Sequence, residues 1–533
     1  MKYLDFSRLK VLRVTVIAIL LFCGSYAFLF IRESLSQFTD GMILDSKETA
    51  AYGFYAAKLA YAENDMLGSL ARIFSNRSTV ENVVVTGTAE SVPVLLYHGL
   101  VDIPDGENIT KTNFEAQMFA LKQAGWKTIS VEDFNSFVKG EKTLPNKSFL
   151  LTFDDGAKSS YYPVDPILRA LDYNAVTFII SGHSLTDSDR KSSYYLNANE
   201  LRAMKRSGRW EIQAHADSGH VFQSISINGE QGHYYTNKLW LKELGRLETD
   251  DEYEQRIGHD ISLVKEKIER VLDIASVSFA FPYGDFAQNI TNYPEAQRVL
   301  LNSVKDNYDL AFFQTYPSAG FTQNYFDDNT FLVKRIDVGG AWTDADLLRV
   351  LNAGRSKEIP LHIYDFSLNE EWIKEWGNIG LKNSSLVLRA GEKTTGAAVV
   401  LDGTRNWENY HLKALIDWTR GESLSLVARY KDSKNFTSCN VSGRFIRIDE
   451  SINGERKKIA ETSIDQNFSW DNATFELSVH KNTIKCFIDG EELLSVDSLD
   501  SSLDRGGIGF KVWDPVENNS EVIVNQLIVE KLL

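Results

Sequence analysis

Two adjacent aspartates, Asp154 and Asp155, stand at the end of a short apolar run. This run, residues 149–153, predicts a buried strand of the parallel type. In α/β proteins the carboxyl ends of such strands are where chemistry is placed. Neighbouring carboxylates repel each other unless a cation or a shared proton relieves them. A helix cap beside a solvated acid explains a bare Asp-Asp-Gly as well, so the interpretation depends on other residues.

Two histidines, His215 and His220, follow a second predicted strand at residues 210–214 and share a loop with Gly219. Imidazoles with this spacing can converge on one metal ion. One carboxylate and two imidazoles leave positions open for water and substrate, which is typical of a catalytic metal site rather than a closed structural one. The alternative is a surface or core histidine pair. The neighbouring aspartates favour the metal site.

Three motifs together resemble the polysaccharide deacetylase (NodB-type, carbohydrate esterase) family. They are Thr-Phe-Asp-Asp-Gly at residues 152–156, the histidine loop, and Phe-Pro-Tyr-Gly at residues 281–284. The histidine spacing and the Leu-Leu-Tyr-His-Gly stretch at residues 95–99 are most similar to the family's exported poly-N-acetylglucosamine deacetylases. The resemblance covers about residues 91–365. It implies a distorted (β/α) barrel that hydrolyses N-acetyl groups of a polysaccharide.

The resemblance also implies a role for each motif residue. Asp154 matches the general base that takes a proton from water, whereas Asp155, His215 and His220 match the metal ligands. The backbone N–H of Tyr283 matches a donor to the tetrahedral oxyanion. The ligand set suits Zn²⁺ best, although Co²⁺, Ni²⁺ or Fe²⁺ fit the same ligands.

Two positions depart from the family pattern. The arginine that often precedes the Pro-Tyr motif and orients the base is replaced by Ala280. The family's general-acid histidine is best matched by His362, with His98 as its competitor because His98 also ends a predicted strand. His98, Pro282 and Tyr283 are the residues expected to contact substrate.

The barrel is predicted from alternating strand and helix patterns. A cap at Asn113 is expected to start the first of these helices, and Asp337 is noted as a possible support for the general acid. Residues 221–251 form a long polar and aromatic loop beside the histidines, which either lines a glycan groove or is a surface insertion. The expected strands are residues 94–97, 126–131, 149–153, 176–180, 210–214 and 277–281.

The N-terminus and the overall charge indicate where the chain acts. Residues 14–31 are 18 uncharged, mostly apolar residues after four basic ones, which predicts a signal anchor with the bulk of the chain outside the cell. A cleaved signal peptide is the alternative. Residues 32–90 are expected to form a helical stalk and linker. The net charge of −16 argues against nucleic acid as a partner.

The C-terminal region, residues 366–533, has short alternating strands and polar turns, which predict a β-sandwich. Asp489-Gly490 is a strong hairpin signal. The region resembles concanavalin-like jelly-roll modules of carbohydrate-active enzymes, which implies carbohydrate binding. Cys439 and Cys486 can pair if this region is exported. Trp407, Trp418 and Trp513 either stack on sugars or, as is more usual for tryptophan in a sandwich, pack in the core.

The leading hypothesis is a membrane-anchored, metal-dependent deacetylase of poly-N-acetylglucosamine. A surface glycan-binding protein with an inactive barrel is the alternative from another class, because Ala280 and the imperfect His362 motif weaken the catalytic pattern. Peptidoglycan or chitin are alternative substrates for the same chemistry.

Overall fold

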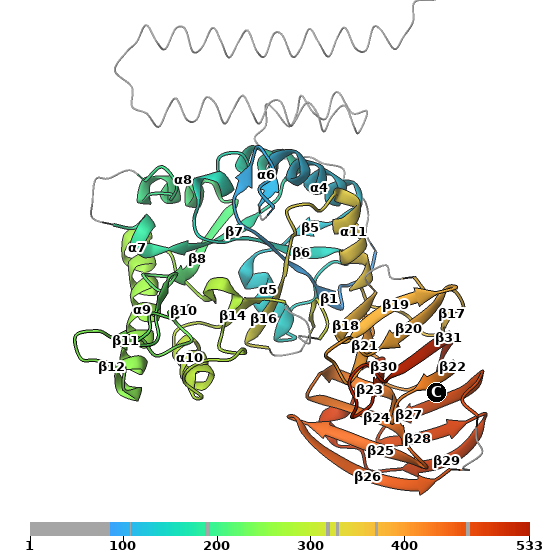
Figure 1. Ribbon diagram of the computed structural model, residues 1–533. Helices are drawn as coiled ribbons and strands as arrows, with labels where there is room; N and C mark the ends of the chain where they lie inside the picture. The colour runs from blue at the N-terminus through green and yellow to red at the C-terminus, as the bar shows by residue number, and fades with distance from the viewer. Residues whose placement is uncertain are drawn as a thin grey trace, which may run out of the picture. The chain divides into compact units, whose positions relative to one another are not determined.

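The computed structural model describes residues 86–532, except residues 107, 187–191, 316–319, 327–329, 368–370 and 465–468. The described residues form two compact units, which run from blue to yellow and from yellow to red in Figure 1. The first contains residues up to Gln314 and Phe326–Leu347, and the second contains Thr315–Tyr325 and Leu348–Leu533. The predicted anchor and nearly all of the predicted stalk lie outside the described residues. Among the described residues, no helix is long and apolar enough to cross a membrane.

Seven parallel strands close into a barrel in the first unit, which confirms the predicted fold. The ring closes because β2 and β6, the first two barrel strands in chain order, pair in register from Val94↔Leu150 to Tyr97↔Phe153. Strands β6 and β7 are buried along their whole length, as expected for apolar runs covered on both faces. The strands in ring order are β2 (Val94–Tyr97), β16 (Leu332–Asp337), β14 (Leu310–Gln314), β13 (Ser278–Ala280), β8 (Trp210–Ala216), β7 (Ala175–Ile180) and β6 (Ser148–Phe153).

Short strands and helices surround this ring. The additional strands of the unit are β1 (Ser91–Val92), β3 (Leu100–Val101), β4 (Ile109–Thr110) and β5 (Lys127–Thr128), of which β5 extends the edge of β6. The helices are α4 (Lys111–Gln123), α5 (Val131–Val138), α6 (Asp165–Leu171), α7 (Ser181–Ser184), α8 (Ala198–Ser207), α9 (Asp250–Leu272), α10 (Ala296–Lys305) and α11 (Asp344–Ala353), the last of which extends into the second unit.

Helix starts follow local capping chemistry. Thr110, rather than the predicted Asn113, caps α4, and its hydroxyl accepts a hydrogen bond from the backbone N–H of Asn113. Helix α9 begins with a reciprocal capping box between Thr249 and Glu252.

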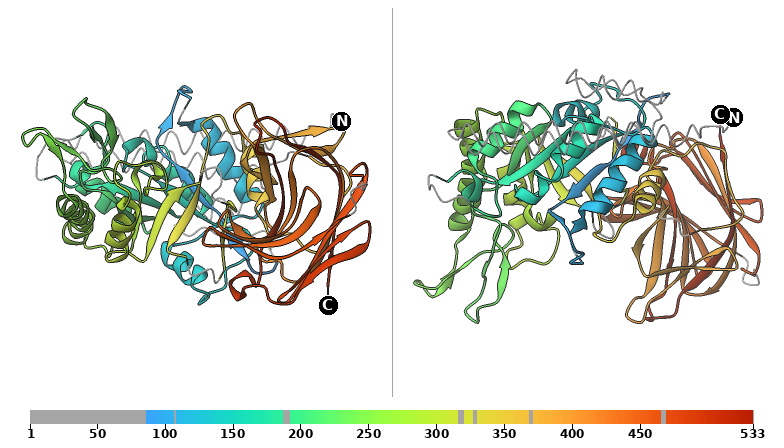
Figure 2. Two further views of the ribbon diagram at one scale, coloured as in Figure 1. Left: turned by 60° about the horizontal axis from the view of Figure 1, so that its bottom comes forward. Right: turned by 90° about the horizontal axis from the view of Figure 1, so that it is seen from above.

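Residues 221–251, predicted as a long loop, form two small antiparallel hairpins and the start of α9. The first pairs β9 (Phe222–Ser224) with β10 (Gln231–His233), and the second pairs β11 (Trp240–Leu241) with β12 (Arg246–Leu247). Arg256 of α9 anchors the segment by donating to the carbonyls of Tyr234 and Asn237 and to the Glu248 carboxylate. The hairpins stand out from the barrel as green arms in both views of Figure 2.

The second unit is the predicted β-sandwich, with two antiparallel sheets. The first sheet contains β19 (Asn378–Lys382), β20 (Ser385–Arg389), β31 (Glu521–Lys531), β22 (Tyr410–Arg420), β27 (Ala473–His480), β28 (Thr483–Ile488) and β29 (Glu491–Val496), with β17 (Leu361–Ile363) also paired to β31. The second sheet contains β18 (Trp372–Trp376), β21 (Gly396–Leu401), β30 (Gly507–Trp513), β23 (Ser423–Asp432), β24 (Asn435–Ser442), β25 (Phe445–Ile452) and β26 (Glu455–Ser463). The unit also contains β15 (Asn324–Tyr325).

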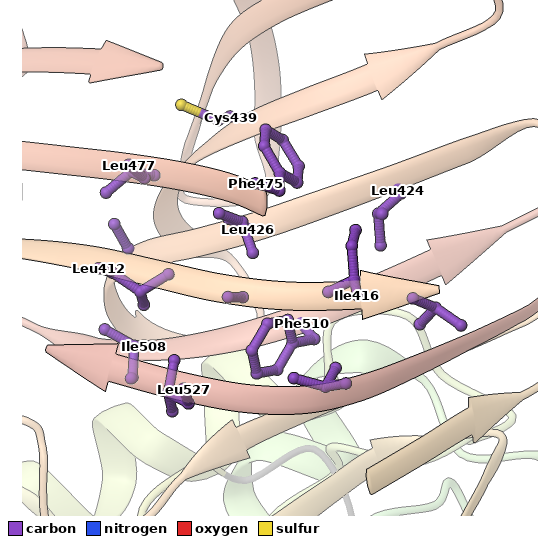
Figure 3. Close-up of a cluster of buried hydrophobic side chains, with 14 of the residues drawn as sticks. Leu412, Ile416, Leu424, Leu426, Cys439, Phe475, Leu477, Ile508, Phe510 and Leu527 are labelled. Atoms are coloured by element: carbon purple, nitrogen blue, oxygen red, sulfur yellow. The ribbon is translucent and has the colours of Figure 1, made fainter. Parts of the chain in front are cut away.

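Apolar side chains from both sheets fill the space between them (Figure 3). Leu412 and Phe475 come from the first sheet, Leu426 and Phe510 come from the second, and all four are fully buried or nearly so. A disulfide between Cys439 of β24 and Cys486 of β28 links the two sheets. The predicted Asp489-Gly490 hairpin joins β28 to β29.

The three tryptophans considered as sugar-stacking residues differ in exposure. Trp407 is buried in the core and Trp418 packs against it, whereas Trp513 is partly exposed. Two of the three therefore have the packing role that is usual for tryptophan in a sandwich. The likeness to concanavalin-like modules stays a prediction.

The predicted division at residue 365 is too late, because residues 348–365 belong to the second unit. Strand β17 contains His362 and pairs antiparallel with β31, with His362 opposite Ile528. Leu361 and Ile363 pack against the sandwich core, and the strand alternation turns the His362 side chain outward to solvent. The prediction that His362 ends a barrel strand is therefore wrong.

Candidate active site

Asp154 and Asp155 lie at the carboxyl edge of the barrel, directly after β6. The backbone N–H of Asp154 continues the pairing with β2 by donating to the Tyr97 carbonyl at 3.1 Å. Asp155 then takes a left-handed conformation with φ of 70°, which ends the strand abruptly. The turn places the two side chains in different environments, since the Asp154 side chain is 3% exposed and the Asp155 side chain is 18% exposed.

Arg335 of β16 holds Asp154 through two parallel hydrogen bonds of 2.6 and 2.7 Å. Arg335 is fully buried, so this bidentate pair lies inside the barrel. Burial opposes ionisation of Asp154, but the charges of Arg335 and His215 and the hydrogen bonds from Arg335 outweigh it and lower the pKa of Asp154 to about 2. Asp154 is therefore an ionised carboxylate in a fixed orientation.

Asp155, His215 and His220 converge at the same edge. Their nearest ligand atoms all lie within 4.8 Å of one another. The Asp155 Oδ1 atom is 3.6 Å from His215 Nε2 and 3.4 Å from His220 Nε2. A tetrahedral ion with bonds of about 2.0–2.1 Å places its ligand atoms about 3.4 Å apart, so these separations suit such an ion.

The donor atoms are also prepared for a cation. Asp155 Oδ1 is buried and has no hydrogen-bond partner within the described part of the chain. The Nδ1–H group of His215 donates to the Ala280 carbonyl at 2.7 Å, which leaves Nε2 as the unprotonated atom that faces Asp155. Burial, only partly opposed by Asp154, lowers the pKa of His215 to about 4, so its imidazole is neutral at neutral pH. The residues therefore fit a divalent metal.

A buried network holds the loop between the two histidines. Asp260 of α9 accepts hydrogen bonds from the backbone N–H groups of Asp217 and Ser218, at 3.0 and 2.7 Å, and from the Tyr235 hydroxyl. The Tyr235 ring lies against Gly219, where an added Cβ atom would come within 2.5 Å of the ring. The hairpin segment and α9 thus fix the loop that presents His220.

The Phe-Pro-Tyr-Gly motif forms a tight turn after β13. Tyr283 has a left-handed backbone with φ of 59° and ψ of 12°. Its ring lies between those of His220 and His233, with centroid distances of 4.4 and 4.5 Å. Pro282 is buried, so the structure does not support its predicted contact with substrate.

His98 follows β2 and lies beside Asp154, because Tyr97 pairs with Phe153 in the parallel ladder. Asp337 ends the other neighbouring strand, β16, where it pairs with Leu96. Burial raises the pKa of Asp337, and the charges of His98 and Arg335 partly oppose this effect. The barrel therefore presents His98, and not His362, beside the paired carboxylates.

Tyr194 and Tyr195, in the segment before α8, lie near Asp155 at the border of the site. Burial and the nearby charge of Asp155 raise the pKa values of Tyr194 and Tyr195, and the same two causes raise the pKa of Tyr283. Tyr194 is about half exposed, and Tyr195 stacks on His183 at 4.4 Å.

Sequence reasoning missed Arg335 and His233. Arg335 lies in the short run Leu332 to Asp337, where adjacent apolar residues are followed by adjacent basic ones, so the sequence offered no clear period-two signal for β16. Its pairing with Asp154 follows only from the closure of the barrel, which places β16 and β6 on either side of β2. His233 offered no signal, because its contacts depend on the hairpin fold.

Closed parallel strands with carboxylates and imidazoles gathered at their carboxyl edge define a candidate hydrolase site. Residues 141–298 match the polysaccharide deacetylase family, which confirms the resemblance seen in the motifs. This part of the chain is thus similar to polysaccharide deacetylase domains.

Individual relatives are similar over the same region. The poly-beta-1,6-N-acetyl-D-glucosamine N-deacetylase of Escherichia coli K12 is 28% identical over 185 residues, covering 33% of this chain and 28% of the relative. The enzyme of that name from Staphylococcus aureus MSSA476 is 28% identical over 177 residues, covering 33% of this chain and 54% of the relative. The chain thus matches about a quarter to half of the length of these curated relatives.

A solved structure of a de-N-acetylase from Aggregatibacter actinomycetemcomitans is 23% identical. It has a TM-score of 0.41, and the alignment covers 47% of this chain and 96% of that one.

Proposed function

We propose that this protein hydrolyses N-acetyl groups from N-acetylglucosamine units of a polysaccharide, with poly-N-acetylglucosamine as the favoured substrate. The observation on which this rests is the pairing of Asp154 with Arg335 beside the cluster of Asp155, His215 and His220. A binding site alone needs no ionised carboxylate in a fixed orientation next to a metal-ligand set. The names of the similar enzymes support this choice of substrate.

In this proposal Asp155, His215 and His220 hold a divalent cation, for which Zn²⁺ is the best candidate and Co²⁺, Ni²⁺ or Fe²⁺ are alternatives. When bound, the cation polarises the acetamide carbonyl and lowers the pKa of water. Asp154 accepts the proton of the water that attacks the carbonyl carbon, while Arg335 keeps the carboxylate ionised and oriented.

The remaining residues complete the reaction. The backbone N–H of Tyr283 donates a hydrogen bond to the oxyanion that forms when the new C–O bond is made. His98 then gives a proton to the amide nitrogen as the C–N bond breaks, which releases acetate and leaves a free amine on the sugar. Ala280 does not weaken this scheme, because Arg335 supplies the guanidinium that its position lacks.

Export of the chain to the cell surface is also part of this proposal. The buried disulfide between Cys439 and Cys486 supports it, since disulfides persist in oxidising compartments. Attachment to the membrane through residues 14–31 stays a prediction.

Acetate release from defined polymers tests the proposed reaction. The full chain is incubated with poly-N-acetylglucosamine, chitin and peptidoglycan, with and without a chelator. We expect the fastest release from poly-N-acetylglucosamine and its loss with the chelator. Faster release from chitin or peptidoglycan would change the assigned substrate, and release that resists metal removal would refute the role of the cation.

A further inference from the structure

A continuous series of aromatic rings leads from His220 to the surface of the hairpin segment. Tyr283 lies 4.4 Å from His220, and His233 stacks almost parallel on Tyr283 at 4.5 Å with an interplanar angle of 7°. Phe222 of β9 ends the series, at 4.7 Å from His233 and 5.1 Å from Tyr283. Phe222 is 53% exposed, although most phenylalanines are buried. The series therefore ends in an aromatic ring that faces solvent two ring contacts from the site.

His233 is held in one orientation at this outer end. Its Nδ1 atom lies 2.5 Å from the Asp285 carboxylate, which also accepts from the Thr236 hydroxyl at 2.9 Å and the Ala287 N–H at 3.0 Å. Because Nδ1 is engaged, Nε2 is the atom that His233 offers outward, and the side chain is 29% exposed. No described residue hydrogen-bonds Nε2. The exposed Phe222 ring thus lies beside the His233 ring, whose Nε2 atom is oriented and has no hydrogen-bond partner among the described residues.

We propose that Phe222 and His233 form a sugar-binding subsite for the N-acetylglucosamine unit next to the one that is deacetylated. The apolar face of a pyranose ring packs on an aromatic ring, and a hydroxyl or acetamide group hydrogen-bonds to His233 Nε2. A polymer threaded through the proposed active site must pass over one of its borders, and this border is continuous with Tyr283. The subsite rests on the proposed function, because the polymer is the ligand of that same site.

The proposal is tested with Phe222→Ala against a matched control, Ile227→Ala. Ile227 is 75% exposed in the turn of the same hairpin and is not one of the aromatic rings in the series. Kinetics are measured with a pentamer of β-1,6-linked N-acetylglucosamine and with a small aryl acetate ester, which has no second sugar. The measured quantity is the ratio of the two kcat/KM values.

Phe222→Ala is expected to lower the ratio about tenfold through a higher KM for the pentamer, which corresponds to about 1.4 kcal/mol of lost contact. Phe222→Trp is expected to keep the ratio, because it retains a stacking face, and Ile227→Ala is expected to leave it unchanged. An unchanged ratio in Phe222→Ala, with either both substrates slowed equally or neither slowed, overturns the subsite. A loss in Ile227→Ala as large as that in Phe222→Ala also overturns it, because the hairpin tip would then act as a whole.

Failure of the proposed function gives a different result. If the wild-type protein releases acetate from no acetylated glycan, pentamer binding is measured by calorimetry for the wild type and both alanine variants. Weaker binding by Phe222→Ala alone supports the subsite, whereas equal binding by all three overturns it.

Discussion

The buried ion pair between Asp154 and Arg335 gives the sharpest prediction about stability. Arg335→Met removes the guanidinium and keeps a long apolar side chain in the barrel. Asp154 and Arg335 are 2% and 0% exposed, so solvent does not screen the loss. Removing one partner of a buried pair costs about 3–5 kcal/mol, because the other charge stays buried and unpaired. We expect a loss of this size in the free energy of unfolding of the barrel at pH 7.

The pH dependence of the loss follows from the pKa of Asp154. In the wild type this pKa is lowered from 3.8 to about 2, so the pair contributes stability above about pH 4 that disappears as the pH falls toward 2. The shift corresponds to on the order of 2 kcal/mol. In Arg335→Met burial remains without the opposing charge, so Asp154 takes up a proton in the folded barrel at a higher pH. The stability difference between wild type and variant should therefore shrink as the pH is lowered from 7 to 4.

Hydrogen exchange of peptides from β6 and β16 measures the stability of the barrel without contribution from the sandwich. The experiment is done in the presence of a chelator, so that cation binding does not contribute to the measured stability. Arg298→Ala is the control, because Arg298 and its partner Glu295 are both more than half exposed. An exposed pair of this kind contributes about 0–1 kcal/mol.

The double variant Arg335→Met, Asp154→Asn decides whether the pairing argument is right. Without either charge, no unpaired ion is buried, so most of the lost stability should return. A double variant as unstable as Arg335→Met, or a difference that grows on acidification, would refute the reasoning.

Three further predictions concern the histidine loop and the sandwich. Asp260→Asn removes one of the acceptors that hold the loop, so metal affinity should fall about 10- to 100-fold in a chelator titration; unchanged affinity would contradict this. Gly219→Ala brings a Cβ atom against the Tyr235 ring, so it too should weaken metal binding, whereas normal affinity would show that the ring can move. Reduction of the Cys439–Cys486 disulfide, which spans 47 residues, should destabilise the sandwich by about 4 kcal/mol; an unchanged melting temperature after verified reduction would argue against this.

Motifs that lie close together in the sequence were predicted well. The apolar run before Asp154 and the spacing of His215 and His220 were enough to predict the two strands and the cluster of Asp155, His215 and His220. Parallel strands deliver their carboxyl ends to one edge of the barrel. The family match over residues 141–298 agrees with these motifs.

Features that depend on pairing between distant segments were not predicted. Arg335 reaches Asp154 only because β16 closes the ring next to β2, and single-sequence patterns do not reveal strand neighbours. His362 was misplaced for the same reason. The three-residue strand β17 has an apolar alternation that fits a barrel strand or a sandwich edge, and only its pairing with β31 decides between them. The ring series at Phe222 and His233 depends on a hairpin that was expected to be an irregular loop.

The central claim is tested most directly by measuring bound metal and acetate release together in the wild type, Asp154→Asn and His215→Ala. On poly-N-acetylglucosamine, we predict acetate release by the wild type alone. Asp154→Asn should keep its metal, because Asp154 is outside the ligand set, and His215→Ala should lose it. A wild-type protein that binds metal but releases no acetate from any acetylated glycan would contradict the account and favour a glycan-binding protein.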